Sequence, residues 1–137
     1  MLLTGDCLSE DILEGLEGAS LLKNGAIHID VLKMPHHGSI RNVTGEFLQR
    51  VTADHYVVSA DGRFDNPDVR TLEILSEARG NAEYRIHLTN HEGAKDLKAR
   101  LDQFFAAQKA AGKKVRPVYR EAEALSLKID LLEAVQH

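Results

Sequence analysis

Segments with the apolar spacing of β-strands alternate along this chain with segments that have the apolar spacing of α-helices. A half-buried strand buries every second residue, whereas a helix buries residues three and four apart. Strands are predicted at residues 27–34, 55–60, 84–89, 115–119 and 125–131, after a short apolar piece at residues 2–3. Helices are predicted to begin near Ser9, Thr44, Asn66 and Ala94. Such alternation indicates an α/β layered domain.

Polar residues, glycines and one proline mark the ends of the predicted helices. Ser9 and Thr44 have side chains that can cap a helix N-terminus. Asn66 precedes Pro67, the combination expected for an N-cap and a first helical residue. Glycines at positions 80 and 112 follow the third and fourth helices as stop signals. Both segments after Gly112 alternate in hydrophobicity, so we expect residues 115–119 and 125–131 to pair as a closing hairpin.

Composition restricts the classes of protein that this chain can represent. Its 137 residues, 43% hydrophobic and 28% charged, suffice for one domain with a core, so we predict a single domain at residues 1–137. The net charge of −4 argues against a dedicated nucleic-acid binder. A single cysteine, Cys7, excludes an internal disulfide, and no apolar run is long enough to span a membrane. These features favour a cytoplasmic protein.

Candidate functional residues follow the predicted strands. In α/β folds, the loops at the carboxyl ends of the strands form the functional site. Residues at such positions are Asp6, His36, His37, Asp61, Asn90 and His91. Carboxylate and imidazole groups are suitable ligands for zinc, manganese or iron, and a carboxylate such as Asp6 can bridge two metals. Asn90 and His91 also suit a turn before the last helix.

Structural roles compete with these functional interpretations. Asp6 could cap the helix that begins near Ser9, because carboxylates are favoured at helix N-termini. His36 and His37 could be turn residues before a glycine. Cys7 could be a soft metal ligand, although a small buried thiol is the more common role. His28 lies on the polar side of its predicted strand, and we expect its imidazole to be a surface or hydrogen-bonded group.

Three motifs together resemble a known family. They are Thr4-Gly5-Asp6 after an apolar strand, Pro35-His36-His37-Gly38-Ser39 after the next strand, and residues 57–63 followed by Asn66-Pro67. This order resembles the C-terminal half of the metallo-β-lactamase fold, in particular the branch that includes the hydrolase-like domain of competence DNA-uptake proteins. The resemblance covers roughly residues 2–90. It implies one half of an αββα sandwich.

The resemblance also assigns roles to individual residues. It implies that Asp6 bridges two divalent metals, that His36 binds the second metal, and that His37 is a ligand, a substrate contact or a proton donor. Ser39 and Arg41 would contact an anionic substrate, and the loop containing Asp61 would rim the active site. The implied metal is zinc, with manganese or iron as alternatives. The implied reaction is attack of a metal-activated water on a phosphodiester or acyl centre, so the substrate would be a nucleic acid or a small ester.

One motif of the family is absent from the sequence. The His-x-His-x-Asp-His cluster, which supplies most of the metal ligands, does not occur, and Asn66 stands where a histidine is common in the family. We therefore expect this chain to be the C-terminal half of a longer domain, with an incomplete metal site and no activity of its own. Its expected partner is the missing N-terminal half or a second copy of the chain. The alternative is a non-catalytic module that self-associates or binds a ligand.

Overall fold

The computed structural model describes residues 1–132, which form a parallel five-stranded sheet with helices between successive strands. The strands lie in sequence order and are β1 (Leu2–Leu3), β2 (Ile27–Lys33), β3 (Val51–Val58), β4 (Tyr84–Leu88) and β5 (Val115–Tyr119). The connecting elements are α1 (Ser9–Gly18), the 3-10 turn η1 (Pro35–Gly38), α2 (Gly45–Arg50), α3 (Val69–Arg79) and α4 (Leu97–Ala110). The predicted α/β class is confirmed.

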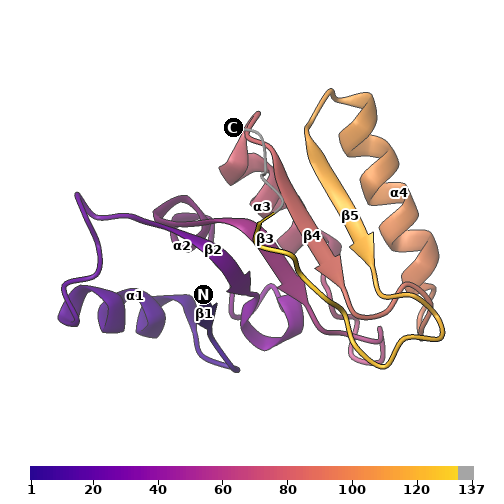
Figure 1. The fold of residues 1–137 in the computed structure, drawn as a ribbon, viewed down its shortest axis with the longest axis horizontal. Coiled ribbons are helices and arrows are strands. Elements are labelled where there is room, and N and C mark those ends of the chain that lie inside the picture. The colour runs from indigo at the N-terminus through magenta and orange to yellow at the C-terminus, as the bar shows by residue number, and fades with distance from the viewer. Residues whose placement is uncertain (133–137) are drawn as a thin grey trace.

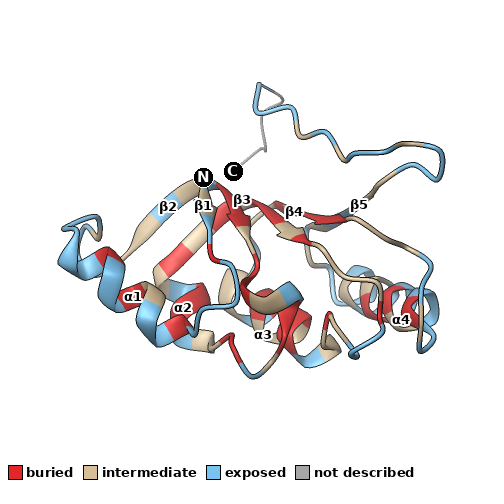
Figure 2. Cartoon of the chain, turned by 90° about the horizontal axis from the view of Figure 1, so that it is seen from below, coloured by how far each residue is buried: buried red, intermediate tan, exposed pale blue. Residues whose placement is uncertain are grey.

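All four helices of residues 1–132 lie on the same side of the sheet (Figures 1 and 2). This follows from the strand order, because a right-handed crossover between adjacent parallel strands always places its helix on the same face. We call the helix-covered side the inner face and the opposite side the outer face. The core lies between the inner face and the helices, where strand residues Leu32, Tyr56 and Ile86 are fully buried together with Phe47 and Leu72.

The outer face consists of the strand residues whose side chains point away from this core. One row across the sheet contains Val31, His55, Arg85 and Arg116 as successive register partners. The next row contains Leu3, Lys33, Val57, His87 and Val118. No helix of residues 1–132 covers these two rows (Figure 2). The outer face therefore carries apolar and basic side chains, and Val31, His55 and His87 among them are buried.

Two predicted helix starts need correction. Asn66 is not the N-cap of α3, because the helix begins at Val69 after Asp68. The backbone N–H of Asp68 donates to the Gly38 carbonyl (3.1 Å), and the Asp68 carboxylate accepts from Ile40 N–H (2.8 Å). Residues before α3 are thus bonded to the loop after β2. The helix α4 begins three residues later than predicted, at Leu97.

Thr44 caps α2 as predicted, with its hydroxyl accepting from Phe47 N–H at 3.2 Å. Ser9 has a different role from the one predicted. It is the first residue of α1, the N-cap is Leu8, and no side chain caps this helix. The buried Ser9 hydroxyl instead donates to the Asn42 carbonyl (2.7 Å) and accepts from Thr44 N–H (3.1 Å). It therefore joins α1 to the loop before α2.

The predicted closing hairpin is wrong. The strand β5 pairs in parallel with β4, and the described residues after it, 120–132, contain no strand. We call residues 120–132 the C-terminal segment. Arg120 fixes its start, since its backbone N–H donates to Leu88 O (3.1 Å) and its guanidinium donates to Thr89 O (2.8 Å) and Ala124 O. The chain is thereby turned away from β5 and crosses the outer face (Figure 1).

None of the helices within residues 1–132 combines the length and the apolar character needed to cross a membrane.

Candidate functional site

The loops after β1, β2, β3 and β4 meet at the carboxyl edge of the sheet. The predicted residues Asp6, His36, His37, Asp61 and Asn90 lie in these four loops. The loops are joined by backbone contacts, including a 2.9 Å hydrogen bond from His36 N–H to Gly5 O. The structure therefore places these five residues at the edge of the sheet where α/β folds carry their functional loops.

His36 and His37 occupy an unusual backbone conformation. Both are left-handed, with φ of 43° and 59°, in the middle of η1. Each such non-glycine residue costs about 1–2 kcal/mol. The conformation is held by hydrogen bonds from Ser39 N–H to His36 O (3.0 Å) and from Asp68 N–H to Gly38 O (3.1 Å). These residues do form a turn, and it is one that histidine rarely adopts.

Asn42 determines which nitrogen of His36 carries the proton. The Asn42 amide nitrogen donates to the carbonyls of Asp6 (3.0 Å) and Cys7 (3.3 Å). Its amide oxygen therefore faces His36 Nδ1, at 2.7 Å. Because an amide oxygen can only accept, Nδ1 must donate, and in the neutral ring the lone pair is then on Nε2. This is the form in which a histidine binds a metal, with its second nitrogen oriented by a hydrogen bond.

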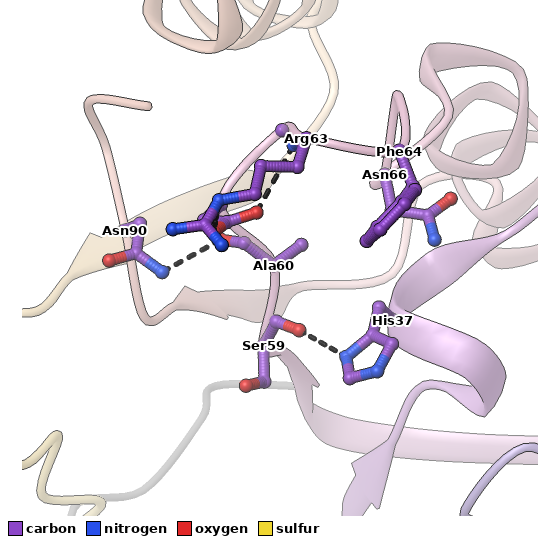
Figure 3. Close-up of a pocket in the computed structure, with 9 residues that line it drawn as sticks. His37, Ser59, Ala60, Arg63, Phe64, Asn66 and Asn90 are labelled. Carbon is purple, nitrogen blue, oxygen red and sulfur yellow. Dashed lines mark hydrogen bonds and ion pairs between the residues drawn. The ribbon is translucent and has the colours of Figure 1, made fainter. Parts of the chain in front are cut away.

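His37 is in the same form for a similar reason. Its Nδ1 lies 2.5 Å from the backbone oxygen of Ser59, which can only accept (Figure 3). In the neutral ring the lone pair is again on Nε2, and the side chain is exposed. Both histidines thus offer a ring nitrogen from a hydrogen-bonded turn, and both remain suited to a ligand or proton-transfer role.

Asp6 is exposed at the start of the loop that Asn42 holds. The alternative that Asp6 caps α1 is wrong, because that helix has no side-chain cap. Burial lowers the pKa of the nearby Lys33, and the negative charge of Asp6 partly offsets this shift. The expected buried thiol is also wrong, since Cys7 is exposed. The Asp6 carboxylate is therefore available to a ligand.

A cavity of about 310 Å³ lies beside the His36–His37 turn (Figure 3). Its walls include His37, Asp61, Arg63, Phe64, Asn66 and Asn90. Asp61 pairs with Arg63 at 3.0 Å, and Asn90 donates to Ala60 O at 2.8 Å. The cavity thus offers one imidazole, one ion pair and amide groups to a small polar ligand.

The close contact of two loops forms the wall of this cavity. Ala94 N–H donates to Asp61 O at 2.8 Å. A Cβ atom at Gly62 would lie 2.3 Å from the Ala94 oxygen, and one at Gly93 would lie 2.2 Å from the Asp61 oxygen. Glycine is therefore required at both positions for the loops after β3 and β4 to approach this closely.

Two predicted substrate contacts lie outside this cavity. Ser39 is buried, and its hydroxyl accepts from Arg41 N–H at 3.3 Å within the same loop. Arg41 is exposed, and neither residue lines the cavity.

The other histidines in strands or nearby loops have protein partners. His28 bonds to Thr52 (2.9 Å) and Asp54 (3.1 Å), which confirms the expected hydrogen-bonded surface histidine. His91 bonds to Asp102 at 3.0 Å, and its ring lies 4.0 Å from that of Tyr119. His91 is thus directed towards α4 and β5.

Within residues 1–132, no three or more histidine, cysteine, aspartate or glutamate side chains gather as a set of metal ligands. Asp6 and His36 could therefore provide only part of a metal centre. In comparisons with known proteins, no family model, curated protein or solved structure matched the chain.

Proposed function

We propose that Asp6 and His36 contribute to a divalent metal centre, most suitably zinc, in a hydrolase of the metallo-β-lactamase type. The observation that supports this proposal is the Asn42 amide, which orients His36 Nε2 and holds the Asp6 loop at the same time. A carboxylate and a neutral imidazole are both good zinc donors. A second polypeptide segment would supply the remaining ligands, so the chain alone is not expected to hydrolyse substrate.

The cavity beside the turn would hold the substrate, a phosphodiester or an acyl compound. A bound metal would lower the pKa of a coordinated water and so supply the nucleophile. His37 would contact the substrate or transfer a proton, because its Nε2 lone pair is held in place by the bond to Ser59. Asp61 and Arg63 would line the entrance as an ion pair.

Zinc titration of the isolated chain tests this proposal. We expect zinc to perturb the His36 ring in NMR spectra and to bind about tenfold more weakly to His36→Gln and Asp6→Asn variants. His91→Gln is the matched control, because it removes a histidine whose imidazole already bonds to an aspartate. Equal zinc affinity in the wild type and in the His36 and Asp6 variants would contradict the proposal.

A second candidate function, non-catalytic self-association, is favoured by the outer face of the sheet. Parallel sheets are almost always covered on both faces. On β1–β3 this face presents the exposed Leu3 and the partly exposed Val57, with no described helix above them. A second copy of the chain could cover these residues.

Light scattering during gel filtration tests self-association. We expect a dimer at micromolar concentration and a monomer for Val57→Asp, because the introduced charge would be buried in the interface. Ala106→Asp, on the exposed side of α4, is the control and should remain dimeric. A monodisperse wild-type monomer would rule out this function without affecting the zinc proposal.

A further inference from the structure

Phe64 differs from the other phenylalanine and tyrosine side chains of this protein. The four phenylalanines and three tyrosines all fall within residues 1–132, and among them only Phe64 is largely exposed. Its exposed fraction is 84%, whereas Phe47 and Tyr56 are fully buried in the core. Phe64 also lines the cavity beside the His36–His37 turn. The phenyl ring that is left in solvent therefore lies at the candidate substrate site.

A short turn holds Phe64 at the rim of this cavity. The turn is closed by a hydrogen bond from Asp65 N–H to Gly62 O at 3.1 Å. Arg100 of α4 then donates to the backbone oxygens of Asp65 (2.9 Å) and Pro67 (3.3 Å). These bonds tie the turn and the chain after it to α4. The position of the Phe64 ring is therefore set by the backbone, and packing of the core does not account for it.

An amide with spare hydrogen-bonding capacity lies near this ring. In Figure 3, Phe64 is on the same side of the cavity as Asn66 and His37. The Asn66 amide nitrogen makes a long hydrogen bond, 3.4 Å, to His36 O. A carboxamide has two donor hydrogens and an accepting oxygen, so Asn66 can also bond to a ligand. The cavity rim thus combines an apolar surface for the face of a planar ring with an amide for its edge.

We propose that Phe64 stacks on a planar aromatic ring of the substrate. The inference rests on the proposed function, in which this cavity holds the substrate, and it adds the chemical class of the group beside the reacting centre. Stacking on an aromatic side chain tolerates any ring with a π-face and raises affinity about tenfold. The ring would be the base of a nucleotide or the aryl group of a small ester. Phe64 would thus select the substrate without taking part in the reaction.

NMR titrations of the full chain with adenosine monophosphate and with ribose phosphate, without added metal, test the proposal. The two probes differ only in the base, so the contribution of the phosphate charge is the same in both. We expect the nucleotide to shift the Phe64 ring signals and to bind about tenfold more tightly than ribose phosphate. Phe64→Leu keeps an apolar side chain without a π-face and should remove this preference. Equal affinity of the wild type for the two probes, or an unchanged preference in the variant, would overturn the inference.

Tryptophan fluorescence gives a second readout. The chain contains no tryptophan, so Phe64→Trp introduces a single reporter at the cavity rim. Adenosine monophosphate should quench this reporter saturably. Leu125→Trp is the matched control, because Leu125 is fully exposed and does not line the cavity, and its quenching should rise without saturation. The same quenching curve in both variants would contradict stacking at Phe64.

Phenyl phosphate distinguishes the two sources of the ring. Tighter binding of adenosine monophosphate would identify a nucleotide, and tighter binding of phenyl phosphate would identify an aryl ester; either preference supports the inference when Phe64→Leu removes it. These titrations are independent of the zinc titration. Zinc binding at Asp6 and His36 without a ring preference would overturn this inference alone, and a ring preference without zinc binding would overturn the metal centre alone.

Discussion

Replacing Asn42 with alanine is expected to lower the free energy of unfolding by about 2–4 kcal/mol and to release His36 from its present orientation. Asn42 is buried, and its side chain bonds to His36 and to the carbonyls of Asp6 and Cys7. Alanine would leave these three groups without their partner. Urea denaturation measures the first effect. Detection of the protonated ring nitrogen of His36 by nitrogen-15 NMR measures the second.

The Asn42→Asp variant separates the two roles of this side chain. A carboxylate can still accept from His36 Nδ1, but it cannot donate to the carbonyls of Asp6 and Cys7. We therefore expect this variant to be destabilised while the proton stays on Nδ1 of His36. A proton on Nδ1 in both variants, with unchanged stability, would show that Asn42 does not organise the site.

The parallel sheet was predictable because strand and helix spacing are local properties of the sequence. The periodicity of residues 27–34 and 84–89 needs no knowledge of distant residues, and both became strands within one residue of their predicted ends. Pairing between strands is not local. Residues 125–131 alternate as a strand would, but Arg120 binds the end of β4 and directs the chain across the sheet. The hairpin prediction failed because these contacts of Arg120 with Leu88 and Thr89 join residues that are distant in the sequence.

The position of the candidate site on the fold was also predictable, whereas the contacts that organise it were not. The position of Asp6, His36, His37 and Asp61 at the carboxyl edge follows from strand order alone. Asn42 was missed because its role depends on contact with a loop more than thirty residues earlier in the chain. No periodicity or capping pattern distinguishes it from an ordinary loop asparagine. Residues that orient other residues carry little local signal in a single sequence.

Replacing Gly62 with alanine is expected to destabilise the protein by about 3 kcal/mol or more and to change the shape of the cavity that His37 lines. Two costs combine at this position. Gly62 has a φ of +82°, and the added Cβ would lie 2.3 Å from the backbone oxygen of Ala94. The loops after β3 and β4 would have to separate, and the hydrogen bond from Ala94 N–H to Asp61 O would be strained. Thermal or urea denaturation measures the loss.

Two further glycines allow these costs to be measured separately. Gly112 also has a positive φ, +70°, but no atom lies within 4 Å of the point that a Cβ would occupy, so Gly112→Ala should cost only about 1 kcal/mol. Gly93→Ala would introduce the steric contact from the other loop, at 2.2 Å from Asp61 O. If loop contact dominates, the Gly62 and Gly93 variants should both be far less stable than the Gly112 variant and should shift the His37 ring signals. Equal stability of all three variants would mean that the two loops separate at little cost, and the cavity wall would then not be rigid enough to position His37 and Asp61 for a substrate.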